Sequence, residues 1–137
     1  MIALSHVNWF AILAAGVAHF LLGGLWFGAL VGRRYANALG IADRPPQTPG
    51  LSLLAGPFVC GTIVITASAL LLRALGIANY GDALGLGALV GVGYLVPMMV
   101  TIALNPLFPR PFYYAVLNAP FFIVGSLMSC AILVTLP

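Results

Sequence analysis

Charged residues are almost missing from this sequence. Only 5% of its 137 residues are charged, whereas roughly 25% are charged in a typical soluble domain. Lysine is absent, and Asp43 and Asp82 are the two acidic residues. So few charges cannot cover a water-facing surface, and 63% of the residues are hydrophobic. This composition indicates that a lipid bilayer is the solvent for most of the chain.

Acids, cysteines and catalytic motifs are also too scarce to support several classes of function. Both acids lie in connections between apolar runs, so they offer little material for general acid–base chemistry inside a membrane. The two cysteines, Cys60 and Cys130, form no disulfide framework or metal-binding pattern. The chain is therefore expected to be non-enzymatic, with no metal site. Its arginines form no basic stripe, so no nucleic-acid binding is expected.

Long apolar runs are what the sequence has in abundance. Four segments reach the length of about 20 residues that a spanning helix needs, and these are 7–31, 51–72, 83–104 and 112–136. They predict one all-α domain over residues 1–137, an integral membrane bundle of four transmembrane helices. Residues 33–40 predict a short interfacial helix that ends at Gly40.

The distribution of arginine predicts the orientation. Arg33, Arg34, Arg44 and Arg110 lie in the first and third connections, while the second connection has only Arg73. Cytoplasmic loops are enriched in basic residues, so the N- and C-termini are both expected on the non-cytoplasmic side. Arg33, Arg34 and Arg110 would then anchor the cytoplasmic surface through contacts with lipid headgroups.

Small residues mark one face of each predicted helix. In lipid, helices associate through close packing of small side chains. The residues expected to pack in this way are Gly23, Gly56, Gly87, Gly91, Gly125 and Ser129. Ser52 and Cys60 share the face of Gly56 at steps of four residues. The same pattern would serve association between chains, and both interpretations stay open.

Polar residues inside the spans predict two layers in the bundle. Asn8, His19 and Trp26 lie within roughly 20° of one face of the first helix. Depth along each span places His19 beside Tyr94 near the midplane, with Thr62 a further candidate for this layer. The second layer, nearer the cytoplasmic surface, is expected to contain Trp26, Thr101 and Asn118.

His19 has two interpretations. An ionisable residue at bilayer depth is a functional candidate, so His19 is the candidate contact for haem, quinone, pigment or a solute. The simpler interpretation is a neutral imidazole that donates one hydrogen bond between helices. It is favoured because His6, the second histidine, lies at the membrane edge and no carboxylate lies in a span. No cofactor is assigned.

Several stretches resemble one known family. Val7-Asn8-Trp9-Phe10-Ala11-Ile12-Leu13 and Gly23-Gly24-Leu25-Trp26-Phe27 are similar to the first helix of a bacterial membrane family catalogued as domain of unknown function 1761. Residues 33–40, residues 105–110 and Leu117-Asn118-Ala119 resemble later parts of the same family. Two stretches depart from the family pattern. The family usually has a proline soon after the Trp-aromatic pair, where this chain has Gly28-Ala29. It often has Gly-Tyr-His after the Asn-Ala step, where this chain has Pro120-Phe121-Phe122. The resemblance implies a four-helix, multi-pass protein of the bacterial inner membrane and supplies no activity.

These observations favour a non-enzymatic accessory or structural subunit of a larger membrane complex, including a photosynthetic or respiratory one, or a small homo-oligomer. The alternative is a small transporter or channel that uses His19 and Tyr94 at the bundle midplane. Pro57, Pro97 and Pro120 interrupt three spans, which fits broken transporter helices and also simple kinks. The expected partners are membrane lipids and other membrane-protein subunits or further copies of this chain.

Overall fold

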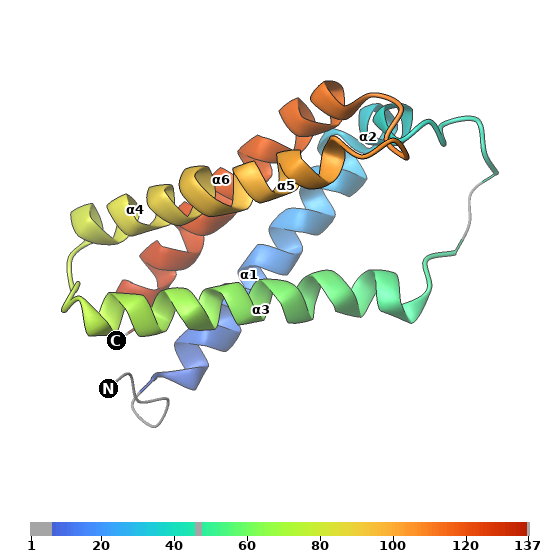
Figure 1. Ribbon diagram of the computed structural model, residues 1–137. Coiled ribbons are helices and arrows are strands. Elements are labelled where there is room, and N and C mark those ends of the chain that lie inside the picture. Colours follow the sequence, from blue (N-terminus) through green and yellow to red (C-terminus); the bar gives the residue numbers. More distant parts are fainter. Residues whose placement is uncertain (1–6, 46–47, 137) are drawn as a thin grey trace.

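The computed structural model describes residues 7–45 and 48–136, and every regular element within them is helical (Figure 1). Four long spans are formed by α1 (Trp9–Gly24) continued by η2 (Leu25–Leu30), by α3 (Leu51–Ala74), by α4 (Tyr80–Ala88) continued by η3 (Leu89–Leu95) and α5 (Val96–Ala103), and by α6 (Pro111–Thr135). Each has 22 to 25 residues and is apolar enough to cross a membrane. The chain is a multi-pass membrane protein.

Two spans begin where asparagine caps a helix. Asn8 Oδ1 accepts hydrogen bonds from the backbone N–H groups of Phe10 (3.0 Å) and Ala11 (3.2 Å), so α1 begins at Trp9. Asn79 Oδ1 accepts from the Asp82 N–H at 2.9 Å, so α4 begins at Tyr80 rather than at the predicted residue 83. Its polar first turn is invisible to hydropathy but is stabilised by the cap.

Two glycines end helices in the left-handed region. The short helix α2 (Gly32–Ala38) begins one residue before the predicted segment 33–40 and ends two residues before Gly40, which has φ of 69°. Gly76 has φ of 66° just after α3. Glycine adopts this conformation without steric cost. A methyl group at Gly40 would lie 3.1 Å from the Pro109 ring, so α2 is held against the link that leads into α6.

α6 is the central helix of the bundle. It contacts α1, α2, α3, α4 and α5, and it is the most buried of the four spans. Its buried face consists of Leu117, Asn118, Phe121, Gly125, Ser126, Ser129, Cys130 and Leu133. The start of α1 and the end of α6 lie at the same end of the bundle (Figure 1).

The pairing of α4 and η3 with α6 depends on glycine, as predicted. A methyl group at Gly87 would lie 2.9 Å from the Ser126 carbonyl oxygen and 3.0 Å from the Leu127 Cα. One at Gly91 would lie 3.0 Å from the Ile123 Cα. Real side chains do not fit at such distances from a backbone, so the two helices approach each other closely only because both positions are glycine.

The outward face of the first half of α3 does not pack into the bundle. Residues 51–64 include none that are buried, whereas Ile65, Ser68, Ala69 and Leu72 are. In Figure 1 the start of α3 stands away from the other spans. The prediction that Gly56 packs inside the bundle is wrong, because no atom would lie within 4 Å of a methyl group there. Ser52 and Cys60, on the same face, are exposed.

Two spans contain turns of π-helix. η3 directly precedes Pro97, which has no N–H to donate and whose ring excludes the carbonyl group four residues back. The Val96 N–H accordingly bonds to the Gly91 carbonyl, five residues back. η2 ends with a bond of the same kind, from the Val31 N–H to the Trp26 carbonyl at 2.9 Å. A methyl group at Gly32 would lie 2.7 Å from the Phe27 carbonyl oxygen, so glycine is required where the chain turns into α2.

Candidate functional site

His19 lies at the crossing of three helices. A methyl group at Gly61 of α3 would lie 3.3 Å from its Cδ2, and one at Gly125 of α6 would lie 2.5 Å from its Cε1 and 2.7 Å from its Nδ1. The imidazole therefore fills a slot between two glycines. The Phe121 ring lies against it, with the ring centroids 5.1 Å apart. The sequence identified His19 and Gly125, but Gly61 was missed because it is off the face of Ser52, Gly56 and Cys60.

The ring nitrogens determine what this slot could do. His19 Nδ1 is buried, makes no hydrogen bond of standard geometry among the described residues, and faces the backbone of Gly125. The Gly125 backbone on α6 is thus the partner toward which the expected hydrogen bond between helices is directed. Over residues 7–45 and 48–136, no three histidine, cysteine or acidic side chains gather in a way that would hold a metal ion. The slot offers one imidazole in an apolar, aromatic surrounding.

Tyr94 does not join this layer. Its side chain is 67% exposed on the outside of the bundle, so the predicted His19–Tyr94 pair is wrong. Tyr94 is three residues after Gly91, which faces α6, and three residues of α-helix would bring it to within about 60° of that face. Both residues lie in η3, a π-helix with more residues per turn than an α-helix. Three residues therefore rotate the chain less about the helix axis, which leaves Tyr94 farther from the face of Gly91. Thr62 does lie near α1, with its Oγ1 3.1 Å from a methyl group at Gly16.

The second predicted layer is formed in part. Trp26 Nε1 donates to the Leu117 carbonyl of α6 at 3.0 Å. Asn118, the next residue, is buried and donates its Nδ2 to the Tyr114 carbonyl at 2.7 Å. Thr101 is exposed and donates to the Pro97 carbonyl on its own helix at 2.9 Å, so its inclusion in this layer is wrong. The hydroxyl group is satisfied locally and needs no partner on another helix.

The common face of Asn8, His19 and Trp26 is confirmed. Asn8 Nδ2 donates to the Leu136 carbonyl at 3.2 Å, so all three residues contact α6 or its end. Gly23 lies on this face too, because a methyl group there would lie 3.6 Å from the Phe121 ring. Ser129 of α6 is buried as predicted, and its Oγ has no hydrogen-bond partner among the residues described.

A column of aromatic rings leads from His19 to the end of the bundle that carries α2. Phe121 lies against Phe27 (5.0 Å between centroids), Phe27 against Tyr35 (4.9 Å) and Tyr35 against Tyr114 (5.6 Å). Burial, and after it the neighbouring Tyr114, raises the pKa of Tyr35 above its ordinary value. The sequence did not reveal this column, because its rings come from three elements and no single periodicity connects them.

Residues far apart in the sequence that carried the family resemblance meet in the structure. Trp26 belongs to the first stretch and Leu117-Asn118-Ala119 to the last, and the indole donates to the Leu117 carbonyl. A family model described as "Protein of unknown function (DUF1761)" matches residues 10–134. The chain belongs to this family. Comparisons with curated proteins and with solved structures find no match. Membership agrees with the four-span architecture and assigns no reaction.

The end of the bundle that carries α2 is basic. Arg33 and Arg34 in α2 and Arg110 at the start of α6 are all exposed. Phe108 lies against Tyr114 with centroids 4.9 Å apart, so aromatic rings lie close to these arginines in the chain. This arrangement is that of interfacial anchors, in which aromatic and basic side chains sit at the headgroup level.

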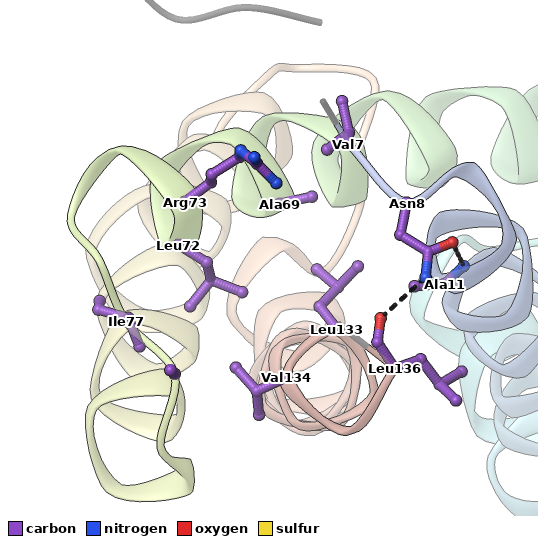
Figure 2. Close-up of a pocket in the computed structure, with 11 residues that line it drawn as sticks. Val7, Asn8, Ala11, Ala69, Leu72, Arg73, Ile77, Leu133, Val134 and Leu136 are labelled. Carbon is purple, nitrogen blue, oxygen red and sulfur yellow. Dashed lines mark hydrogen bonds between the residues drawn. The ribbon is translucent and has the colours of Figure 1, made fainter. Parts of the chain in front are cut away.

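A cleft opens at the opposite end of the bundle (Figure 2). It has a volume of about 360 Å³ and lies where α1 begins and where α3 and α6 end. Its lining consists of Val7, Asn8, Ala11, Ala69, Leu72, Arg73, Ile77, Ala78, Leu133, Val134 and Leu136. Nothing in the sequence indicated this cleft, because these residues come from three separate segments.

Proposed function

We propose that this protein is a non-enzymatic subunit of a larger membrane complex, and that it associates through the first half of α3. The supporting observation is the outward face of that half, where Ser52 and Cys60 are exposed and a methyl group at Gly56 would meet nothing within 4 Å. A face of small residues permits close packing with another helix, and none of the described residues packs on Gly56.

The physical argument concerns the membrane as a solvent. Lipid tails are as apolar as leucine, so helices in a bilayer gain little from burying apolar surface. They gain from close van der Waals contact, which small side chains permit. Leu51 (82% exposed), Leu53 and Leu54 flank the small residues and would provide the rims of such a contact. A partner helix would therefore gain more from this face than lipid does.

The chemistry of the described residues supports a role without catalysis. Asp43 lies outside the four spans, and Asp82 lies in the first turn of α4, at the end of the third span and far from the level of His19. General acid–base catalysis needs a positioned group whose pKa suits proton transfer, usually with a second group to orient it. The finer features proposed with this function are a bacterial inner-membrane location and termini on the non-cytoplasmic side, supported by the four arginines of the first and third connections.

Extraction from the native membrane tests this function. The untagged protein, taken up in mild detergent and examined by native mass spectrometry, should come out in fixed stoichiometry with larger subunits. Gly56→Phe should abolish that association without unfolding the protein, since the position has free space around it. Gly85→Phe on α4 is the matched control, because its surroundings are equally open. If the wild type is recovered as a homo-oligomer, the proposed association is with further copies of this chain and not with larger subunits. Recovery as a free monomer would refute both kinds of association.

The buried His19 Nδ1, which makes no hydrogen bond of standard geometry and faces the Gly125 backbone, favours a second candidate, a small transporter or channel. A buried polar atom whose hydrogen bonding is incomplete costs free energy, and a passing solute could complete it. Because Tyr94 lies outside, this candidate rests on His19 alone. Solute flux into proteoliposomes that His19→Gln abolishes would support it. Equal flux in wild type and His19→Gln would count against it.

A further inference from the structure

The cleft at the end of α3 has the dimensions and lining of a small-ligand site. Ligand pockets occupy roughly 300–1,000 Å³, are mostly apolar and contain a few polar groups that orient the ligand. The cleft, at about 360 Å³, falls at the lower end of this range. Its walls are the aliphatic side chains of Ala69, Leu72, Leu133 and Val134 (Figure 2).

One cationic side chain faces this apolar space. Arg73 lies one residue before the end of α3 and lines the cleft, and Figure 2 shows its guanidinium group beside Ala69. Among the described residues Arg73 forms no ion pair. Asp82, in the first turn of α4, accepts instead a hydrogen bond from Asn79 Nδ2 at 2.7 Å.

The other polar side chain of the cleft is already engaged. Asn8 Oδ1 caps α1, and its Nδ2 donates to the Leu136 carbonyl at 3.2 Å. This bond and the one between Tyr80 Oη and Thr135 Oγ1 (2.8 Å) fasten the ends of three helices around the cleft. The cleft is therefore a fixed feature of the bundle end, and Arg73 is the group that would meet an incoming ligand.

We propose that this cleft binds an anionic amphiphile with at least one alkyl chain. Its carboxylate or phosphate would accept hydrogen bonds from Arg73, whose planar fork of donors matches both anions. Its alkyl chain would lie between Leu72 and Leu133. The cleft lies at the end of three spans, the depth at which lipid headgroups meet the hydrocarbon core. Free fatty acids and anionic phospholipids share this chemistry. The site is independent of the association proposed for α3.

The test uses the full chain in nanodiscs made of zwitterionic phosphatidylcholine. Binding of the fluorescent fatty acid cis-parinarate is measured, followed by competition with oleate, with phosphatidylglycerol and with uncharged oleyl alcohol. Arg73→Gln should weaken parinarate binding by about tenfold or more, which corresponds to the loss of one charge-assisted interaction. Arg34→Gln is the matched control, because that exposed arginine lies at the opposite end. It should bind like the wild type.

A second variant tests whether binding needs the cleft itself and not only the positive charge of Arg73. Ala78 is exposed and lines the cleft, so Ala78→Trp should fill the opening and weaken binding without disturbing the core. Competition by oleate alone would identify a fatty acid as the ligand, and competition by phosphatidylglycerol would identify a phospholipid headgroup. Equal competition by oleyl alcohol, unchanged binding in Arg73→Gln, or equal losses in Arg73→Gln and Arg34→Gln would each overturn the proposal.

Discussion

His19 fits inside an apolar bundle because two of its neighbours are glycines, which have no side chain. Gly61 and Gly125 present bare backbone to the two sides of the imidazole, and Phe121 lies against it. A larger residue at either glycine would have to displace the ring. Since the core of a protein is close-packed, such a displacement costs free energy even when only one methyl group is added.

Gly125→Ala is expected to lower the free energy of unfolding by about 1–3 kcal/mol, the usual cost of overpacking. Its methyl group would lie 2.5 Å from His19 Cε1. The measurement is unfolding in mixed detergent–SDS micelles followed by circular dichroism. Gly24→Ala is the control, with nothing within 4 Å, and it should be neutral or slightly stabilising. If Gly125→Ala costs as much in a His19→Ala background as in the wild type, the slot is not what penalises it.

Trp26→Phe is expected to cost about 0.5–1.5 kcal/mol, the net value of one hydrogen bond. The indole N–H donates to the Leu117 carbonyl, and phenylalanine cannot replace this donor. The same unfolding experiment measures the loss. Trp9→Phe is the matched control because Trp9 is 57% exposed, and it should change stability by less than about 0.5 kcal/mol. Equal losses in the two variants would show that the bond contributes nothing.

Single residues were placed correctly from the sequence where the helix is regular, and wrongly where a side chain bonds to its own helix. Asn8, His19 and Trp26 were placed on one face correctly, because the regular turns of α1 and the short extension to Trp26 preserve the spacing. Thr101 was placed wrongly because a hydroxyl group can bond to the carbonyl four residues back on its own helix. Nothing in a sequence distinguishes a threonine that does this from one that bonds to a neighbouring helix.

At the scale of elements, the helices were predictable and their internal irregularities were not. Apolar length alone located all four spans, since a bilayer admits helices of that length and composition. The π-helical turns η2 and η3 shift the faces of the residues within and after them. Tyr94 illustrates the consequence, because its outward position follows from wider turns that the sequence signals only through Pro97.

The attachment of α2 is expected to weaken at alkaline pH. Burial, with a contribution from Tyr114, raises the pKa of Tyr35, so the folded protein favours the neutral phenol. The stability that this provides is complete below the unfolded pKa of about 10 and is lost as the pH rises toward the folded value. Unfolding measured at about pH 9 and pH 11 should show a loss in the wild type that is smaller in Tyr35→Phe.

The matched control for that experiment is Tyr113→Phe, since Tyr113 is 38% exposed at the same end of α6. It should lose as much stability as the wild type between the two pH values. Absorbance at the phenolate band follows the ionisation itself, and a component that ionises at high pH in the wild type should be missing from Tyr35→Phe. A Tyr35→Phe protein with an unchanged alkaline loss would contradict the assignment to Tyr35.

At the scale of the whole molecule, the two ends of the bundle differ in kind. One end carries α2 with its exposed arginines, and the other carries the cleft and the hydrogen bonds that tie Asn8 to Leu136 and Tyr80 to Thr135. The sequence predicted the basic end from arginine counts. It could not predict the cleft, because the cleft depends on how three distant segments fit together.

The orientation is expected to place the α2 end in the cytoplasm. Ala78→Cys in the second connection and Leu107→Cys in the third, each made in a background of Cys60→Ser and Cys130→Ser, report the two sides. Both positions are exposed, Leu107 by 85%. On intact cells a membrane-impermeant maleimide should label Ala78→Cys at once and Leu107→Cys only after the membrane is disrupted. The reverse pattern would invert the topology.

The slot around His19 also has a consequence for how sequences of this family diverge. The side chain at position 19 and the backbones at positions 61 and 125 are in direct contact, and together they fill the space between the three helices. A relative with a smaller side chain at position 19 gains room that alanine or serine at 61 or 125 would fill, whereas a relative that keeps histidine must keep both glycines. Substitutions at these three sites should therefore be correlated across an alignment, as expected for positions in direct contact.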